Sequence, residues 1–393
     1  MHIAVVASSA PSHMHPHLAV VRELVDRGHR VSYLVGGHLA DLARPTGADV
    51  LGYDSLLPGS PTAPASWPDD DTAGMRMFLD DQIHVLPQVR AALDADPPDI
   101  VLYDIGGMAG PVAADLWGVA SAQLSPSAVA WDGYHEDMAE VLEPIYGSPA
   151  GQKYLRDFDA WLASAGTSLI FDDVTGVPRR CLVLIPRVMQ PNSDRVDAVR
   201  YRFVGPCIDP RRENADDWTP PAGDGPLALM AFGTAYTDRI DLYRNVIGAL
   251  DGTGWRLVIA TGRVAPDELG DVHGWVQVRK TVPQPAVLRV ADAFVTHAGM
   301  GSCTEGLWYG VPMLAIPQAV DQPSNADQLE AIGAGRHLTG VSPSPGQIRD
   351  AFLEVAADSQ IRLRLKAIRD ELHRVGGPGH AADAVEDVAS GRW

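Results

Sequence analysis

The sequence predicts an α/β protein made of two doubly wound domains, each built on a parallel sheet. Three observations carry this prediction: a length of 393 residues, a regular alternation of short apolar runs with helical patterns, and a proline-rich polar stretch that divides the alternation into two series. A single core rarely grows beyond about 250–300 residues, so a chain of this length is expected to form two domains. Strand-like runs separated by helices predict parallel strands joined by crossover helices.

The first series opens with a buried strand, HIAVVA, at residues 2–7. A small and polar turn is expected from Ser8 to Pro16, and apolar residues at helical spacing from Leu18 onward predict a helix that ends at Gly28. Four further strand-like runs lie at 30–36, 99–104, 120–126 and 180–186, with helical segments between them.

The second series begins with PLALMAFGT at residues 226–234 and continues through WRLVIATG, VQVRKTV, AFVTHAG and PMLAIPQ. Residues 205–225 lie between the two series, and their prolines, glycines and charges predict an exposed linker. The predicted domains are therefore 1–204 and 226–375. Residues 376–393 follow a Gly-Pro break and are expected to form a terminal helix that packs back on the first domain.

The composition limits the kinds of partner. The chain has 50 acidic and 31 basic side chains and a formal charge of −19, which argues against nucleic acid or an anionic membrane. Its cysteines, Cys181, Cys207 and Cys303, are far apart, which predicts neither a disulfide framework nor a zinc cluster and favours a cytoplasmic location. The N-terminus is interpreted as a strand and not as a signal peptide, and no run approaches the ~20 apolar residues of a membrane helix.

The most informative segment is 293–329, where a strand that ends at Thr296 is followed by the loop 297–302 and by a helix that begins near Ser302. Glycines allow close backbone approach, and exposed amides at a helix start attract phosphate. His297 and Ser302 can donate hydrogen bonds to the same anion. Asp321 and Gln322 follow the next strand and suit vicinal sugar hydroxyls, while Glu305 is a candidate for a ribose diol.

These residues resemble the donor-binding signature of the family 1 glycosyltransferases of the GT-B fold, which use UDP- or TDP-sugars. The resemblance rests on Val282-Pro283-Gln284, Thr296-His297-Ala298-Gly299, Ser302, Glu305, Gly310-Val311-Pro312 and Asp321-Gln322, in the family's order. It implies two Rossmann-like domains that face a central cleft. It also implies the donor contacts: Val282 with the base, Gln284 and Glu305 with ribose, His297, Gly299, Gly301 and Ser302 with the diphosphate, and Asp321 and Gln322 with the sugar.

Two positions extend or depart from this pattern. Gly233-Thr234 resembles the pair that family members place beside the diphosphate. Many relatives carry a tryptophan just before the residue that matches Val282, where its ring stacks on the base, but this chain has Thr281. The choice between uracil and thymine therefore stays open.

The N-terminal half offers a catalytic base. Transfer to a hydroxyl needs a group that removes the proton, and histidine is the natural choice. Of His13, His15 and His17, the family pattern of a histidine three positions before a proline selects His13, although the usual preceding glycine is Ser12. Metal ligands and plain loop residues are the alternatives for the three histidines. Asp104 ends a strand-like run, as the family's dyad aspartate does, and would fix the tautomer of the base; Asp99 would lie at the opposite edge.

Across nearly its whole length the chain is closest to the bacterial macrolide glycosyltransferases of the oleandomycin type, on RELVDRGHRVSYLV, LSPSAVAWDGY and PQAVDQPSNAD. The resemblance implies an inverting O-glycosyltransferase that uses UDP-glucose or a TDP-sugar, needs no metal, and acts on a hydrophobic hydroxylated natural product such as a macrolide. A monomer or homodimer is expected. Acceptor walls are expected from Trp67, Met75, Phe78, Ile83, Trp131, Tyr134 and Met138, for which core packing is about as good an explanation.

Three other functions remain open from the sequence. A deoxysugar transferase of antibiotic biosynthesis would share both the donor-binding residues and the His13–Asp104 pair. A non-catalytic auxiliary protein on the same fold is suggested by Thr281, since a fold does not determine a function. A sugar-nucleotide epimerase would convert its donor without an acceptor, which the apolar N-terminal segments disfavour.

Overall fold

The structure is a computed structural model that describes residues 1–61, 63, 67–68, 70–214, 218–233, 238–340 and 342–393. The chain divides into two compact units, and it crosses between them twice. Unit 1 consists of Met1–Cys207 together with Gly377–Trp393, and unit 2 consists of Ile208–Gly376. Within these described ranges each unit contains one sheet, and the paired strands are parallel.

Unit 1 contains a seven-stranded sheet with the order β3-β2-β1-β4-β5-β6-β7. This order reverses between β1 and β4, which is the signature of a doubly wound domain. Its strands are β1 (His2–Val6), β2 (Arg30–Gly36), β3 (Asp49–Tyr53), β4 (Ile100–Asp104), β5 (Ala120–Ser125), β6 (Cys181–Val183) and β7 (Tyr201–Phe203). Its helices are α1 (Pro11–Asp26), α2 (Ala40–Ala43), α3 (Asp71–Leu93), α4 (Ala109–Trp117), α5 (Tyr134–Asp137), α6 (Ala139–Tyr146), α7 (Pro149–Ala165) and α14 (Pro378–Ala389).

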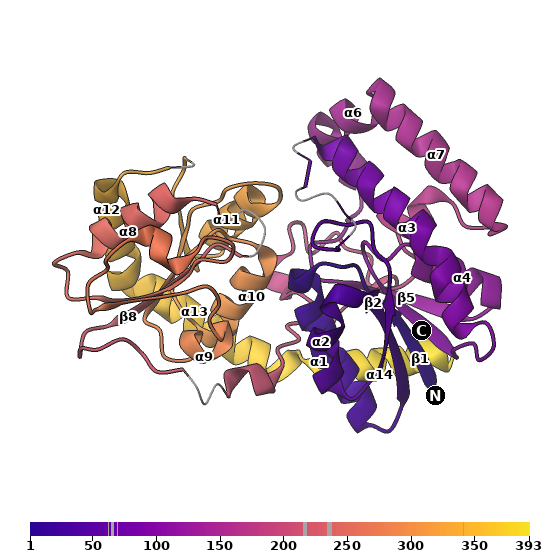
Figure 1. Ribbon diagram of the computed structural model, residues 1–393, viewed down its shortest axis with the longest axis horizontal. Coiled ribbons are helices and arrows are strands. Elements are labelled where there is room, and N and C mark those ends of the chain that lie inside the picture. Colours follow the sequence, from indigo (N-terminus) through magenta and orange to yellow (C-terminus); the bar gives the residue numbers. More distant parts are fainter. Residues whose placement is uncertain (62, 64–66, 69, 215–217, 234–237, 341) are drawn as a thin grey trace. The chain divides into compact units, whose positions relative to one another are not determined.

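Both faces of the sheet in unit 1 are covered by helices (Figure 1). Successive side chains of a strand point to opposite faces. In β1, Ile3 and Val5 enter a core with α1 and α14, whereas Ala4 and Val6 enter a second core with α3, α4 and α7. This double coverage explains why β1 is a continuous apolar run and does not alternate with polar residues.

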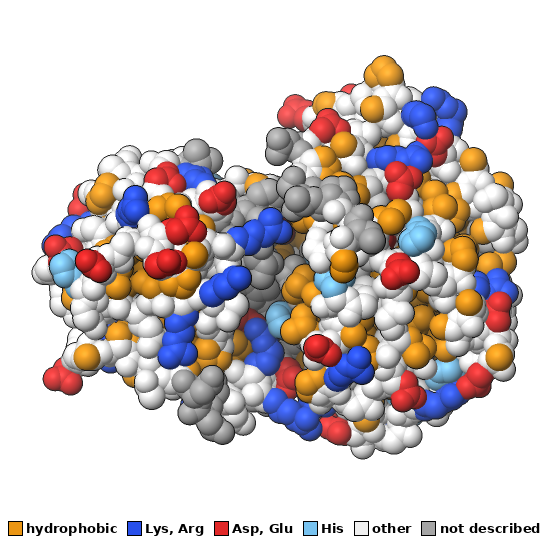
Figure 2. Space-filling view, in the orientation of Figure 1, with side chains coloured by type: hydrophobic (Ala, Val, Ile, Leu, Met, Phe, Trp, Pro, Cys, Tyr) orange, Lys and Arg blue, Asp and Glu red, His pale blue; other side chains and the backbone are white. Residues whose placement is uncertain are grey.

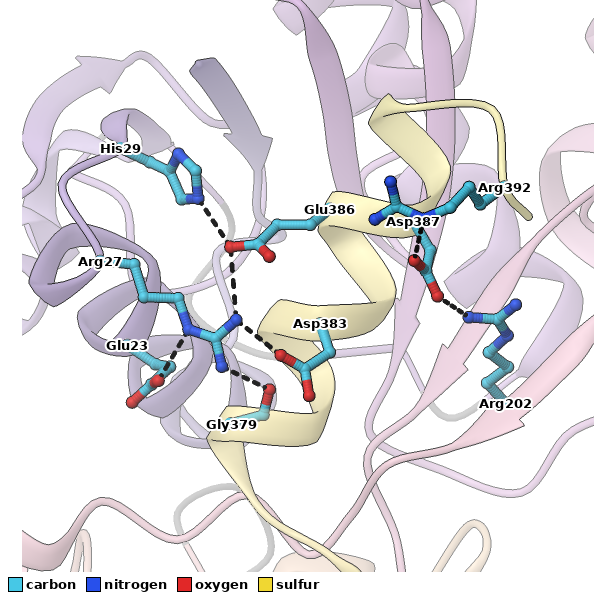
Figure 3. Close-up of polar contacts among 9 residues, drawn as sticks. All are labelled: Glu23, Arg27, His29, Arg202, Gly379, Asp383, Glu386, Asp387 and Arg392. Atoms are coloured by element: carbon cyan, nitrogen blue, oxygen red, sulfur yellow. Dashed lines mark hydrogen bonds and ion pairs between the residues drawn. The ribbon is translucent and has the colours of Figure 1, made fainter.

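The helix α14 belongs to unit 1 although it follows unit 2 in the sequence. Its apolar face is buried in the core beside α1, through Ala381, Ala382, Ala384, Val385 and Val388. Its polar face is held by ion pairs (Figure 3). Arg27, the C-cap residue of α1, contacts Asp383 at 2.7 Å and Glu386 at 3.3 Å. Arg202 of β7 contacts Asp387 at 2.8 Å, so ion pairs tie the second half of α14 both to the end of α1 and to β7.

Unit 2 repeats the same design with a six-stranded sheet of order β10-β9-β8-β11-β12-β13. Here the order reverses between β8 and β11. The strands are β8 (Leu227–Ala231), β9 (Arg256–Ala260), β10 (Val276–Arg279), β11 (Ala293–Thr296), β12 (Met313–Ala315) and β13 (Gly335–His337). The helices are α8 (Ile240–Leu250), α9 (Gln284–Leu288), α10 (Met300–Tyr309), α11 (Gln322–Ala331), α12 (Pro345–Ala357) and α13 (Ser359–Val375).

Two local expectations differ from the structure. The turn expected from Ser8 to Pro16 is shorter, because α1 already begins at Pro11 and has Pro16 inside it. A proline at the first helical position is favourable, since its missing N–H would have no partner there. The stretch 205–225 is not exposed throughout. Cys207 and Ile208 are buried, and Trp218 donates a hydrogen bond of 2.9 Å to Gln277 of β10.

Charged side chains of both signs are interspersed over the face of the protein seen in Figure 2. The acidic excess of the sequence therefore does not gather into one patch on that face. Among the described residues, no helix is both long enough and apolar enough to span a membrane.

Candidate active site and donor site

In unit 1 the candidate catalytic residues meet where the strand order reverses. β1 leads into α1, which carries His13 in its first turn, and the neighbouring strand β4 ends with Asp104. Parallel strands end at one edge of the sheet, and the crevice at such a reversal is where doubly wound domains bind ligands. Asp99, the rejected alternative, accepts a hydrogen bond of 2.7 Å from the backbone N–H of His2, at the opposite end of these strands.

His13 and Asp104 form a hydrogen-bonded pair. Nδ1 of His13 lies 3.2 Å from Oδ1 and 3.1 Å from Oδ2 of Asp104. An ionised carboxylate can only accept, so Nδ1 carries the proton in this pair and Nε2 is the basic nitrogen. The side chain of Asp104 is fully buried, whereas the side chain of His13 is 31% exposed. The pair therefore combines a shielded carboxylate with an imidazole that solvent can reach.

The surroundings of Asp104 keep it ionised. Burial by itself raises the pKa of a carboxyl group. Here electrostatic interactions with His13 and His17, together with hydrogen bonds from His13 and Ser8, outweigh burial and hold the pKa of Asp104 well below its ordinary value. The backbone N–H of Gly106 adds a hydrogen bond of 2.9 Å to Oδ1.

A second histidine also faces this carboxylate. His17 lies one helical turn after His13, and its Nε2 is 3.4 Å from Oδ2 of Asp104. Its side chain is fully buried, and burial lowers its pKa to about 4 against the opposing effect of Asp104. From sequence, His17 is one of three loop histidines, with catalytic base, metal ligand and plain loop residue as the possible roles. The spacing of four between His13 and His17 would have revealed its position beside Asp104, had the helix been expected to begin at Pro11.

The residues expected to line an acceptor pocket fall into two groups. Phe78 of α3 stacks on Trp67 with the ring centroids 5.3 Å apart. A Cβ at Gly106 would lie 3.1 Å from Phe78 and 3.3 Å from Oδ1 of Asp104, so the Phe78 ring borders the catalytic pair. Met75 and Phe78 also pack against the core of unit 1, so packing and acceptor contact both apply to them.

The remaining acceptor residues lie apart from Phe78 in sequence. Ile83 is five positions after Phe78, which places it about 140° around α3, and it is 37% exposed. Trp131 and Tyr134 form an edge-to-face pair with centroids 4.9 Å apart, and Trp131 donates to Asp137 at 2.7 Å. Met138 precedes α6 and is half-buried.

In unit 2 the expected phosphate loop lies at the corresponding reversal. Gly233 follows β8 and His297 follows its neighbour β11. The imidazole of His297 is enclosed by two glycines, since a Cβ at Gly233 or Gly299 would lie 2.6 Å or 2.5 Å from its Nε2. Burial lowers the pKa of His297 to about 4, so the ring is neutral at pH 7. Thr234, expected beside Gly233, lies outside the described residues.

The start of α10 presents backbone donors at this loop. Gly299 caps the helix, and the N–H groups of its first turn have no intrahelical partner. Gly301 is exposed, and a Cβ there would meet nothing within 4 Å, whereas Ser302 is buried. The positive end of the helix dipole and these donors favour an anion.

Glu305 and Gln284, the residues expected to hold ribose, are hydrogen-bonded to each other at 2.8 Å. Nε2 of Gln284 also lies 3.4 Å from the hydroxyl of Ser302. Arg212 donates to the other oxygen of Glu305 at 2.8 Å, a contact that sequence reasoning missed. Arg212 lies in a charged stretch of the expected linker, where no spacing rule connects it to Glu305.

Asp321 and Gln322 differ in what they contact. Asp321 is exposed and accepts a hydrogen bond of 2.8 Å from Asn325, whose amide also holds the backbone carbonyl of Ala298 at 3.0 Å. The carboxamide oxygen of Gln322 accepts from the backbone N–H groups of Gln318 and Ala319, and the side chain is buried. Gln322 therefore shapes the loop before α11. Val282 and Thr281 follow β10, and Thr281 is exposed.

Comparison with known proteins identifies the family. The chain is 42% identical to the oleandomycin glycosyltransferase of Streptomyces antibioticus over 391 residues, which cover 98% of this chain and 90% of that protein. The chain belongs to the GT-B glycosyltransferases of the oleandomycin type. This glycosyltransferase is also 30% identical to the NDP-glycosyltransferase YjiC of Bacillus licheniformis, with 98% of this chain and 97% of that protein covered. Residues 245–388 match the family described as erythromycin biosynthesis protein CIII-like, C-terminal domain.

Solved structures agree with this assignment. The glycosyltransferase of kitacinnamycin has a TM-score of 0.89 and 40% identity, with 98% of both chains covered. The calicheamicin glycosyltransferase CalG4 has a TM-score of 0.83 and 27% identity, with 99% of this chain and 98% of that chain covered. The predicted GT-B fold, the family and the enzyme class are therefore confirmed.

Proposed function

We propose that this glycosyltransferase moves a hexose, with glucose as the first candidate, from a UDP- or TDP-sugar to a hydroxyl of a macrolide or another hydrophobic natural product. Support for the donor comes from the phosphate loop around His297 and from Glu305. Support for the acceptor class comes from the aromatic side chains beside Asp104 and from a relative named for oleandomycin.

The hydrogen-bonded pair of His13 and Asp104 carries the mechanistic part of the proposal. Nε2 of His13 takes the proton of the acceptor hydroxyl as the oxygen attacks the anomeric carbon. The bond from that carbon to the diphosphate oxygen breaks, and the nucleoside diphosphate leaves with the bonding electrons. Asp104 stabilises the imidazolium that forms, and attack from the face opposite the leaving group inverts the configuration.

The residues at the phosphate loop would stabilise the departing nucleoside diphosphate without a bound cation. The diphosphate would receive hydrogen bonds from His297, Ser302 and the backbone of the first turn of α10, and the helix dipole would stabilise its charge. We therefore propose that transfer needs no metal and that activity persists in EDTA. Loss of activity in EDTA that Mg²⁺ restores would contradict this part.

The test is direct. Purified protein is incubated with UDP-glucose or TDP-glucose and a panel of macrolides and flavonoids, and nucleoside diphosphate release and glycoside mass are measured. His13→Ala should abolish transfer, whereas His15→Ala, two positions away on the same helix, is the matched control and should retain it. An equal loss in both variants, or product formation by His13→Ala, would overturn the assignment of the base.

The panel also separates the alternatives. Transfer only from TDP-deoxysugars would indicate a deoxysugar transferase, with the same roles for His13 and Asp104. Donor conversion without an acceptor would indicate an epimerase. The anomeric configuration of the product, read from its proton coupling constant, decides between inversion and retention.

A further inference from the structure

The buried imidazole of His17 is not used by the mechanism proposed above, although it faces the same carboxylate as His13. α1 presents these two rings on one side because residues four apart lie one turn apart. The Nδ1 of His13 approaches both oxygens of Asp104 nearly equally, at 3.2 and 3.1 Å, while Nε2 of His17 faces Oδ2 alone at 3.4 Å. The carboxylate of Asp104 therefore lies close to two histidine rings.

Burying an imidazole costs free energy unless its polar atoms find partners. The side chain of His17 is fully buried, its Nε2 lies 3.4 Å from Oδ2 of Asp104, and neither ring nitrogen makes a well-aligned hydrogen bond to another described residue. A leucine at this position of α1 would fill the same core without that cost. The position of the ring therefore points to a role at the carboxylate.

The contacts around Asp104 restrict its rotation. Oδ1 is held by the N–H of Gly106 at 2.9 Å, and Oδ2 faces His17. These contacts, together with the hydrogen bond from Ser8, favour the orientation in which both carboxylate oxygens face Nδ1 of His13. Without His17, Oδ2 would lose a polar neighbour, and the carboxylate would turn more easily about its last bond.

We propose that His17 is a positioning residue which, as a neutral imidazole, directs its Nε2–H to Asp104 and so sets the orientation and the basicity of His13. This inference rests on the proposed function. A donor on Oδ2 disperses the negative charge of the carboxylate and weakens its attraction for protonated His13. Removal of that donor raises the pKa of His13 and lets its ring leave the reactive orientation.

Other ionisable groups near His17 do not replace this effect. From β4 the ring faces Asp104, and from its own helix it faces His13. Tyr33 of β2, which also lies near Asp104, stays neutral because burial raises its pKa. On α14, Asp383, Glu386 and Asp387 are paired with Arg27, His29, Arg202 and Arg392 (Figure 3).

The experiment compares two substitutions of similar size. His17→Gln retains an N–H donor near the place of Nε2, and His17→Leu removes it. We expect kcat of His17→Leu to fall about tenfold with KM for the acceptor nearly unchanged, and the acid limb of kcat/KM to move up by about 0.5–1 pH unit. His17→Gln should restore kcat to within about threefold of wild type.

The pKa of His13 is also measured without turnover, by NMR titration of the imidazole resonances, assigned by their loss in His13→Ala. A higher pKa of His13 in His17→Leu supports the proposal, and an unchanged pKa overturns it, whether or not the protein transfers a sugar. A failure of the proposed reaction would instead show as absent transfer in the wild type.

A purely structural role would lower the melting temperature of both variants equally and leave the pKa of His13 unchanged, which would also overturn the proposal. The wild-type protein supplies a test that does not require a folded leucine variant. At neutral pH, the imidazole nitrogens of His17 should report a neutral ring protonated at Nε2. A ring protonated at Nδ1 would overturn the inference.

Discussion

Replacement of Asp104 by asparagine tests the catalytic pair most sharply, because it removes a charge with little change of shape. The carboxylate lies 3.1 Å from Nδ1 of His13 and is fully buried. At an effective dielectric constant of about 20, two unit charges at that distance attract by roughly 5 kcal/mol. The charge on His13 develops only as the hydroxyl proton moves, so this attraction acts on the transition state.

A loss of roughly 5 kcal/mol corresponds to a fall of about 10³–10⁴-fold in kcat, since each 1.36 kcal/mol is a factor of ten. Because His13 is partly exposed and solvent weakens the attraction, we expect a fall in kcat of about 10³-fold, the lower end of this range. The assay is nucleoside diphosphate release at saturating donor and acceptor, with the melting temperature as the control for folding. A folded Asp104→Asn variant within tenfold of the wild-type kcat would refute the assigned role of the carboxylate.

Three further predictions concern the donor site and stability. Gly299→Ala would place a Cβ 2.5 Å from Nε2 of His297 and displace the ring. We expect KM for the donor to rise about tenfold in steady-state kinetics, as for the loss of a hydrogen bond to a charged group. An unchanged KM would contradict this prediction. Arg212→Ala frees an oxygen of Glu305, for which Arg212 would compete with the ribose of the donor. Because the ion pair that is lost is worth about 1 kcal/mol, we expect the Kd of UDP to fall about fivefold in calorimetry. Weaker binding would exclude this competition. The pKa of His17 falls from 6.5 to about 4 on folding, so the unfolded chain binds more protons than the folded chain between these pH values. The free energy of unfolding should therefore fall by about 3 kcal/mol as the pH drops from 6.5 to 4. Denaturation curves should show a smaller fall for His17→Gln, and an identical pH dependence would disprove this assignment.

The features that could be predicted from sequence are those that depend on local pattern. Continuous apolar runs such as β1 and β4 are what a sheet covered on both faces requires, and parallel strands bring His13 and Asp104 to one edge. The glycines around His297 likewise indicate an anion site from type and order alone. These inferences need no knowledge of side-chain contacts.

The rest depended on helix limits and on contacts between distant segments. Treating Pro16 as the end of a turn hid the helical relation of His13 and His17, because a proline near a helix start does not stop the helix. Arg212 reaches Glu305 across 93 positions of sequence, which no spacing rule anticipates. The oxygen of Gln322 binds the backbone of its own loop, a contact that the sequence pattern does not show, and its role at the sugar stays a prediction.

The discontinuity of unit 1 has a consequence for synthesis in the cell. The ribosome produces α14 only after all of unit 2, so the core beside α1 stays open while Ile208–Gly376 are made. During that interval the apolar surface that Val385 and its neighbours later cover is exposed to chaperones and to other nascent chains. Production of this enzyme is therefore expected to be more sensitive to premature termination near residue 377 than the size of the missing piece would indicate.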